Sequence, residues 1–309
     1  LATRWGTDIG DNGAGIVRHS SGTHQVTNTL YVGFYRNSGD CVYELGGTAI
    51  LNTDTTSLND GNGLFTHGTA AQHNVSVDLL MGNDADGNSV YDMAGGQLAV
   101  TRNEYIGYYG PASMTQRDGT HTVGGEFRLG REAGGDGAYD LQGGTLTVGN
   151  TEIGRRGTGA FAHAAGTFNA GTTYLARLTG SRGSYDLAGT GVLNAGALYV
   201  GYWGDANFHQ TGGTCNVGGN LTLCSGSAAD ANYLITAGQL TVDQELRLGM
   251  AGSSSAPTAL FTQRGGSVDA DKLDVGALAN DGNYSISGGR LAVDTLRIGN
   301  GVFRIDDPA

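Results

Sequence analysis

The chain has 309 residues, including 56 glycines but only 3 prolines, so it bends often yet lacks the proline of collagen-like or disordered glycine-rich sequences. Its 17 basic and 29 acidic residues give a net charge of −12, and without a basic stripe the chain is not suited to binding nucleic acid. No apolar run approaches the roughly 20 residues of a membrane helix, which argues against membrane insertion.

A repeat occupies nearly the whole sequence, and residues 139–148, with the sequence YDLQGGTLTV, are its clearest example. The repeat has two alternating versions, one that begins with tyrosine and one that begins mostly with phenylalanine. Successive starts lie 19 to 28 residues apart, and mostly 22 to 26, which predicts one supersecondary unit per repeat. The starts are Val17, Tyr43, Phe65, Tyr91, Met114, Tyr139, Phe161, Tyr185, Phe208, Tyr233, Phe261, Tyr284 and Phe303.

Each repeat contains three short segments that alternate between apolar and polar residues and are separated by glycine-rich bends. In the clearest example these segments are residues 138–141, 145–148 and 151–153. Most repeats then close with an aliphatic residue and a glycine, as at Ile153 and Gly154. Three strands per repeat without a helical stretch predict that each repeat is one coil of a parallel β-helix. We therefore expect a single all-β domain over residues 1–309, a solenoid of about 12 to 13 coils with roughly 24 residues per coil.

The coil length helps to choose among the repeat folds. Left-handed hexapeptide helices use about 18 residues per coil, so roughly 24 residues favour a right-handed parallel β-helix. A β-propeller needs blades of about 40 residues, which a pair of repeats could supply, and this alternative stays open. A leucine-rich repeat fits less well because no helical segment follows the strand.

The first segment of each coil places its first and third residues inward, so the repeat starts are predicted to stack in a core column with neighbours about 4.8 Å apart. The third position alternates between aliphatic residues and polar ones. The polar residues are His19, His67, Gln116, His163, Gln210 and Gln263. We expect them to hydrogen-bond the backbone of the adjacent glycine bend. Successive polar members lie about 10 Å apart, too far to share one metal ion.

Aromatic and arginine residues follow the closing glycine in several coils and would occupy the same corner of the solenoid. They are Phe34, Tyr35, Arg36, Tyr108, Tyr109, Arg155, Arg156, Tyr202 and Trp203. Flat rings beside arginines suit a sugar chain or another protein surface. The candidate ligand-binding residues are Tyr108, Tyr109, Arg155, Arg156, Tyr202 and Trp203. The alternative is that the rings fold over the corner and shield backbone edges.

Little in the sequence suggests catalysis or a cofactor. Residues 84–88 resemble the start of a calcium loop but lack its later glutamate, so we expect an ordinary turn. Some parallel β-helices cleave polysaccharides, which requires clustered carboxylates. The best local collection is Asp136, Asp140, Glu152, Arg155 and Arg156, although the sequence does not fix its geometry. With three scattered cysteines and no nucleophile or phosphate-loop motif, we expect no catalytic residue, metal or cofactor.

The repeated pattern of an aromatic residue, Leu, Gly-Gly, Leu and Val, followed by Ile-Gly, resembles the glycine-rich strand repeats of autotransporter passengers and of large bacterial secreted or surface proteins. The resemblance covers residues 9–305. It implies a β-helical stalk displayed outside the cell. It transfers no catalytic residue, because the repeats carry none.

These observations favour a non-catalytic structural or adhesive rod, extracellular or on the cell surface. A carbohydrate-binding or polysaccharide-cleaving β-helix, with a surface polysaccharide as ligand, is the alternative. Thr7 and Ile9 occupy third-strand positions near the start of the chain, and Phe303 and Ile305 occupy first-strand positions near its end. Because neither end carries a polar cap, we expect the chain either to be a segment of a longer rod or to join copies of itself head to tail into a filament.

Overall fold

The computed structural model describes residues 1–4, 6–11, 13–34, 39–59, 63–226, 230–249, 258–276 and 282–306. The chain is an all-β parallel solenoid of about 11 turns with about 24 residues per turn, and the described residues contain no helix. This confirms the predicted fold class, and the number of turns is close to the 12 or 13 expected. The chain divides into two compact units, Leu1–Asn150 (unit 1) and Thr151–Ala309 (unit 2), with the same architecture.

Unit 1 is built from two parallel sheets. The first sheet holds the strands that begin each repeat: β3 (Gly15–His19), β5 (Cys41–Leu45), β7 (Gly63–His67), β10 (Ser89–Met93), β13 (Pro111–Gln116) and β15 (Asp136–Leu141). The second sheet holds β1 (Ala2–Thr3), β2 (Thr7–Ile9), β4 (Thr23–Val32), β6 (Ile50–Leu58), β8 (Gln72–Val75), β9 (Asp78–Met81), β11 (Gln97–Val100), β12 (Asn103–Ile106), β14 (Thr120–Leu129) and β16 (Thr145–Ile153), in which the division falls. Equivalent residues of successive turns pair directly, as Val17, Tyr43 and Phe65 do.

Unit 2 repeats this arrangement. Its first sheet contains β17 (Thr158–His163), β19 (Arg182–Leu187), β21 (Asp205–Gln210), β24 (Ala231–Ile235), β26 (Ala259–Gln263), β28 (Gly282–Ile286) and β30 (Val302–Ile305). Its second sheet contains β18 (Thr167–Leu175), β20 (Val192–Val200), β22 (Thr214–Val217), β23 (Leu221–Leu223), β25 (Gln239–Leu248), β27 (Ser267–Val275) and β29 (Arg290–Ile298). The register is again direct, since Tyr185 pairs with Phe208 and Phe208 with Tyr233.

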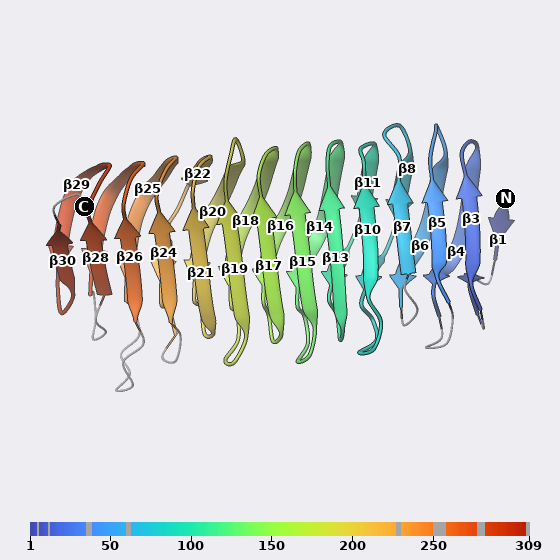
Figure 1. The fold of residues 1–309 in the computed structure, drawn as a ribbon, viewed down its shortest axis with the longest axis horizontal. Helices are drawn as coiled ribbons and strands as arrows, with labels where there is room; N and C mark the ends of the chain where they lie inside the picture. Colours follow the sequence, from blue (N-terminus) through green and yellow to red (C-terminus); the bar gives the residue numbers. More distant parts are fainter. Residues whose placement is uncertain are drawn as a thin grey trace. The chain divides into compact units, whose positions relative to one another are not determined.

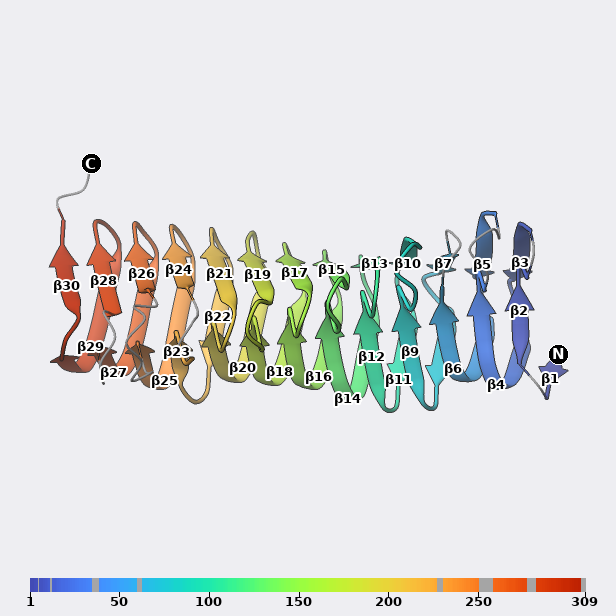
Figure 2. The same ribbon diagram turned by 90° about the horizontal axis from the view of Figure 1, so that it is seen from below.

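Within each unit the chain runs along a first-sheet strand, crosses to the opposite side and returns one position further along, so the coil is right-handed (Figure 1). Figure 2 shows the second-sheet strands from another side. In most turns the second and third predicted segments form one continuous strand, as in β18 and β20, because pairing with the adjacent turn continues through the bend between them. Separate strands occur at β8 and β9, at β11 and β12, and at β22 and β23.

The predicted aromatic column is confirmed in both units. In unit 1, the rings of Tyr43, Phe65 and Tyr91 stack at 5.1 and 4.6 Å between centroids. In unit 2, the stack runs without interruption from Phe161 to Phe303, with adjacent centroids 4.5 to 5.4 Å apart. The stacked tyrosines and nearly all the phenylalanines are fully buried, so this column is the centre of the core.

The polar third residue of each second repeat has two partners. As predicted, its side-chain nitrogen lies 3.0 to 3.5 Å from a carbonyl oxygen of the adjacent bend. Its other polar atom binds the tyrosine hydroxyl of the next turn, which the sequence analysis did not assign. The hydroxyl distances are Tyr43–His19 3.1 Å, Tyr91–His67 2.9 Å, Tyr139–Gln116 2.6 Å, Tyr185–His163 2.8 Å, Tyr233–Gln210 2.7 Å and Tyr284–Gln263 2.7 Å.

In most turns the closing glycine adopts a left-handed backbone conformation, which explains its recurrence. Gly154, for example, has a φ of 74°, and a Cβ there would overlap the carbonyl group of Arg182. Ala176 and Cys224 occupy the same closing position in unit 2 with φ values of 54° and 60°. These two residues adopt a conformation that glycine would adopt without strain.

Candidate functional site

The predicted ligand-binding residues fall into two clusters, one in each unit. Tyr108 and Tyr109 lie in unit 1, in the turn that follows β12. Arg155, Arg156, Tyr202 and Trp203 lie in unit 2, in the turns that follow β16 and β20. Tyr35 and Arg36, at the corresponding corner of an earlier turn, lie outside the described residues.

In unit 1 the corner is organised around Arg131. Its guanidinium carbon lies 4.6 Å from the ring centroid of Tyr105 and 4.2 Å from that of Tyr108. Glu132 forms an ion pair with the same guanidinium at 2.9 Å. Tyr109 packs against Tyr108 with 4.4 Å between ring centroids and remains 46% exposed. The arginine thus holds two rings in place, and one further ring faces solvent.

In unit 2 the corner is organised in the same way around Arg177. The guanidinium carbon lies 4.3 Å from the ring centroids of both Tyr174 and Tyr202. The two oxygens of Glu152 lie 3.3 Å from Arg177 Nε and 3.3 Å from Arg155 Nε. This carboxylate therefore forms ion pairs with two guanidinium groups at once, which holds the site together.

Trp203 covers backbone next to this cluster. Its ring meets that of Tyr202 edge to face at 6.3 Å, and 41% of the residue is exposed. A Cβ added to Gly226, in the following turn, would approach the tryptophan ring to 2.8 Å. The ring therefore lies directly over the glycine, which is the shielding arrangement considered from the sequence. One ring face of Trp203 and one of Tyr109 remain as surfaces that a ligand could contact.

Arg131 and Arg177, which organise these corners, were not predicted. Each occupies the position after the closing residue, the same position that Tyr108 and Tyr202 occupy in other turns. The pattern that places a residue at this corner, a position directly after a closing glycine, was present for Arg131, which follows Gly130. It was absent for Arg177, because Ala176 replaces the expected glycine.

The carboxylates considered for catalysis are divided between the units. Asp136 and Asp140 belong to unit 1, where Asp140 accepts a hydrogen bond from Gln142 at 2.7 Å. Glu152 belongs to unit 2 and is committed to two arginines. The turn at residues 84–88 is closed by Asp84 itself, whose carboxylate accepts the backbone N–H of Ala85 at 2.8 Å. Among the described residues, no three His, Cys, Asp or Glu side chains gather around a possible metal position.

Unit 1 contains a second set of buried polar residues that the sequence analysis missed. His24, His73 and His121 point inward from the second sheet and alternate with Leu51 and Leu98 in the same column. Their Nδ1 atoms lie 3.0 to 3.1 Å from the hydroxyls of Tyr43, Tyr91 and Tyr139. Each of these hydroxyls thus binds two polar groups. The sequence pattern that could have revealed them is the recurrence of a histidine at the same position in alternate repeats.

The hydrogen bonds around Tyr91 have a definite direction. His67 Nε2 must donate to the Ala71 carbonyl at 3.0 Å, so its Nδ1 accepts from the Tyr91 hydroxyl. His73 Nδ1 must then donate to the Tyr91 oxygen, and its Nε2 accepts from the Thr56 hydroxyl at 3.0 Å. Both histidines are neutral in this arrangement. Burial lowers the pKa of His67 to about 4 and that of His73 well below its usual value, which agrees with neutral rings.

The corresponding group around Tyr139 contains a buried carboxyl. The Tyr139 hydroxyl donates to Gln116, so His121 Nδ1 donates to the tyrosine oxygen. His121 Nε2 lies 2.7 Å from Glu104 Oε2, and both side chains have no exposed surface. A proton must lie between these two atoms, because two lone pairs would repel at this distance. With no access to solvent, the Tyr–His–Glu group cannot meet a substrate and serves to hold adjacent turns together.

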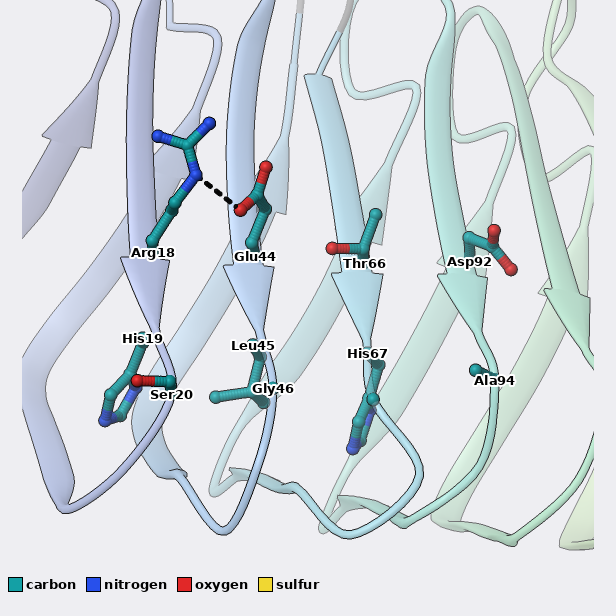
Figure 3. A pocket seen from close by; sticks show the side chains of 11 residues that line it. Arg18, His19, Ser20, Glu44, Leu45, Gly46, Thr66, His67, Asp92 and Ala94 are labelled. Atoms are coloured by element: carbon teal, nitrogen blue, oxygen red, sulfur yellow. Dashed lines mark ion pairs between the residues drawn. The ribbon is translucent and has the colours of Figure 1, made fainter.

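A shallow hollow lies on the outer face of the first sheet in unit 1 (Figure 3). Its volume is about 470 Å³, and Arg18, Glu44, Thr66 and Asp92 line it from successive strands. Arg18 pairs with Glu44 at 2.8 Å. The hollow is open and partly apolar, and the repeat pattern gave no sign of it.

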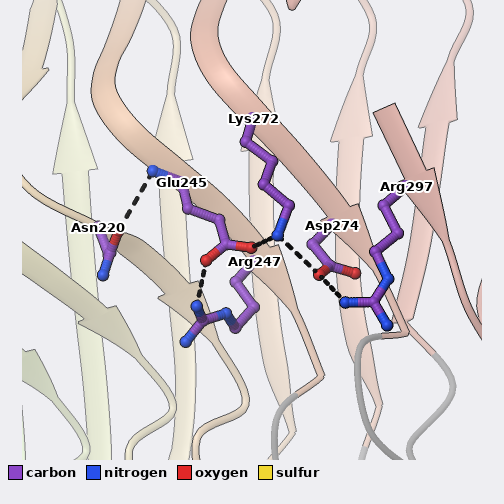
Figure 4. A network of polar contacts seen from close by, with 6 residues as sticks. All are labelled: Asn220, Glu245, Arg247, Lys272, Asp274 and Arg297. Carbon is purple, nitrogen blue, oxygen red and sulfur yellow. Dashed lines mark hydrogen bonds and ion pairs between the residues drawn. The ribbon is translucent and has the colours of Figure 1, made fainter. Parts of the chain in front are cut away.

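A network of opposite charges lies on β25, β27 and β29 of unit 2 (Figure 4). Glu245 pairs with Arg247 and with Lys272, whose Nζ is 2.5 Å from the carboxylate. Asp274 accepts from Lys272 at 3.2 Å and from Arg297 at 3.5 Å. Burial by itself raises the pKa of Glu245, but hydrogen bonds from Lys272 and Arg247 outweigh it and lower that pKa. The network mixes two acidic with three basic groups and offers no surface of a single sign.

No family model matches the chain, and neither a curated protein nor a solved structure matches it. Within the part of the chain that the structure describes, no helix could cross a membrane. The functional interpretation therefore rests on the geometry of the chain itself.

Proposed function

We propose that this protein is a non-catalytic structural or adhesive solenoid that acts outside the cell or on its surface. The proposal rests on the hydrogen bonds that the interior polar groups make to one another between turns. Every hydroxyl of the tyrosine column is bound to a side chain of the preceding turn, so these groups hold turns together and are closed to substrates. The corner arginines are likewise occupied by rings and carboxylates of the same unit.

We extend the proposal to head-to-tail assembly. In the last described turn, Leu296 is 44% and Ile298 50% exposed, although their partners Leu273 and Val275 in the turn before are buried. Ile305 on the last strand is 79% exposed. Phe303 stacks on Tyr284 through one ring face only within the described residues. At the other end, Thr7 and Ile9 belong to β2, which pairs with β4. A second copy placed with β1 to β3 along β29 and β30 would continue both sheets and cover these side chains.

Electron microscopy and sedimentation of the purified chain test this assembly. We expect filaments or end-to-end oligomers that are lost in a Phe303→Lys, Ile305→Asp variant. The matched control is Arg304→Ser on the same strand, whose side chain is 68% exposed in an ion pair with Asp306. Monomers under all conditions would contradict assembly, and depolymerisation of a uronate-containing polysaccharide by the purified chain would contradict the non-catalytic role.

A carbohydrate-binding role is the second candidate, and the exposed rings of Tyr109 and Trp203 favour it. Each ring lies beside an arginine-centred cluster that fixes its orientation. A Tyr202→Ala, Trp203→Ala variant with unchanged thermal stability would lose polysaccharide binding if this role is correct. Equal binding by the variant and the unchanged chain would remove the candidate.

A further inference from the structure

The outer face of the first sheet in unit 1 carries a row of aliphatic side chains over four successive turns. Ile16, Val42, Leu64 and Val90 pair directly from strand to strand and point away from the core. Ile16 is 55% exposed, and the other three are partly exposed. In unit 2 the same row has no two aliphatic neighbours larger than alanine: it runs through Ala160, Ser184, Asn207, Asn232, Leu260, Asn283 and Val302. The aliphatic row is therefore a feature of unit 1 and not a requirement of the repeat.

Two shallow hollows lie on this face. One of about 400 Å³ lies over Val42, Leu64 and Val90. The other, of about 470 Å³, lies beside the adjacent row of Arg18, Glu44, Thr66 and Asp92 (Figure 3). A flat sheet face with an apolar centre and a charged border has the composition of a sheet-on-sheet interface.

We propose that unit 1 binds a second copy of this chain face to face through this aliphatic row. Two sheets pack about 10 Å apart when their side chains interdigitate. A two-fold axis parallel to the strands, between β5 and β7, places Val42 opposite the partner's Leu64 and Ile16 opposite the partner's Val90. The hollows receive the opposing side chains. The inference goes beyond the head-to-tail contact, since it uses the side of unit 1 and not a terminal turn.

The charged row supports a second copy as the occupant. The same axis places Arg18 opposite the partner's Asp92, and Asp92 opposite the partner's Arg18, so that two favourable charge pairs border the apolar row. Glu44 faces the partner's Thr66, which avoids apposing two carboxylates. The surface is thus self-complementary in charge, as an isologous interface requires. Within one copy Arg18 pairs with Glu44 and Asp92 with Arg117, and the side chains of Arg18 and Asp92 are 71% and 36% accessible, so the partner's charges can add to these pairs.

Four aliphatic side chains from each copy with a charged border form a small interface, so we expect a weak dimer that appears at high protein concentration and weakens with salt. Sedimentation equilibrium detects it, in the Phe303→Lys, Ile305→Asp background that blocks end-to-end contacts. Leu64→Lys, on the outer face and away from the core, abolishes the dimer. Thr147→Lys, an exposed position on the second sheet, is the matched control and leaves it unchanged.

A charge exchange identifies the occupant. Arg18→Asp alone apposes two acidic residues across the axis, and Asp92→Arg alone apposes two arginines, so each variant is at least tenfold weaker as a dimer. A mixture of the two variants restores association, because every cross-pair is then of opposite sign. Monomers throughout, or a dimer that none of these variants changes, would overturn the proposal and leave the row for a different partner. Because filament formation is scored separately with the terminal variant, failure of this inference leaves the proposed assembly unaffected.

Discussion

Units 1 and 2 repeat the same coil but treat the tyrosine hydroxyls differently. In unit 1 each hydroxyl lies between two polar side chains, as Tyr91 does between His67 and His73. In unit 2 the second position is occupied by Phe168 or Val268 beside Tyr185 and Tyr284, whereas the thiol of Cys215 hydrogen-bonds the Tyr233 hydroxyl. The aromatic stack is continuous in unit 2, whereas Met114 takes the place of a ring in unit 1. The fold thus accommodates either extra ring packing or extra hydrogen bonds beside the tyrosines. The residue at this position determines how many titratable side chains are buried in each unit.

The largest expected effect comes from breaking the buried pair of His121 and Glu104 in unit 1. A His121→Leu substitution leaves the Glu104 carboxyl without its partner, and we expect a loss of about 3 to 5 kcal/mol in the free energy of unfolding by urea. The double variant His121→Leu, Glu104→Leu recovers most of this loss because no buried carboxyl remains. Cys215→Leu, at the equivalent place in unit 2, is the control and costs less than the single change in unit 1. A double variant as unstable as the single one would contradict this interpretation.

The next largest effect is the loss of stability at low pH, which is expected to differ between the two units. Burial lowers the pKa of His67 and of His163 from 6.5 to about 4, so the unfolded chain binds more protons than the fold between these values. Stability is complete above about pH 6.5 and is lost as the pH falls toward 4, by about 3 kcal/mol for each histidine. Unit 1 also contains His24 and His73, whose pKa values burial lowers, so it loses more stability than unit 2.

Hydrogen exchange at pH 7 and at about pH 5 measures this difference, because peptides from β7 and β10 report on unit 1 and peptides from β17 and β19 on unit 2. His67→Gln and His163→Gln are suitable controls, since glutamine occupies the equivalent position at Gln116 and Gln210. Each substitution is expected to reduce the acid sensitivity of its own unit only. Equal loss of protection in both units would contradict the comparison.

Removing a tyrosine hydroxyl has a smaller effect that also differs between the units. Tyr91→Phe leaves two histidine nitrogens without a partner, whereas Tyr185→Phe leaves one. We expect a loss of about 2 to 3 kcal/mol for the first and about 1 to 2 kcal/mol for the second. Urea unfolding of the two variants measures both losses in the free energy of unfolding. A larger loss in Tyr185→Phe than in Tyr91→Phe would show that the second histidine does not stabilise the fold.

The smallest effect concerns the closing position in unit 2. Ala176→Gly relieves a left-handed conformation in a residue with a Cβ, but it also adds freedom to the unfolded chain. We expect a net gain of about 0.5 kcal/mol. The opposite substitution, Gly107→Ala in unit 1, places a Cβ against the backbone of Asp136 and Gly137 and is strongly destabilising. A loss of stability in Ala176→Gly would mean that packing of its methyl group outweighs the strain.

The fold was predictable because the repeat imposes the same pattern many times. The aromatic starts, the glycine bends and the polar third positions each recur at the coil length, so their stacking follows from strand pairing. The bond from the polar residue to the next tyrosine was missed because it joins two different turns. His73 and His121 were missed because they occupy otherwise aliphatic positions of the second sheet, where Leu51 and Leu98 are found.

The candidate binding residues were predictable as a set but not in their contacts. The corner position of Tyr108 and Tyr202 follows from the closing glycine. That Arg131 and Arg177 lie over these rings depends on side chains from neighbouring turns, which the spacing within one repeat does not reveal. The aliphatic row of Ile16 and Leu64 was overlooked for a similar reason, since it appears only when outward positions are compared across turns.

Nitrogen NMR of protein labelled at its histidines tests most directly whether the buried histidines are neutral groups that hold the turns together. The bonds around Tyr91 predict a proton on Nε2 of His67 and on Nδ1 of His73, and both rings should stay neutral from pH 8 down to about pH 5. Two histidines of opposite tautomer that do not titrate in this range would support this role. Rings that share one tautomer, or that become protonated near 6.5 as exposed imidazoles do, would contradict it.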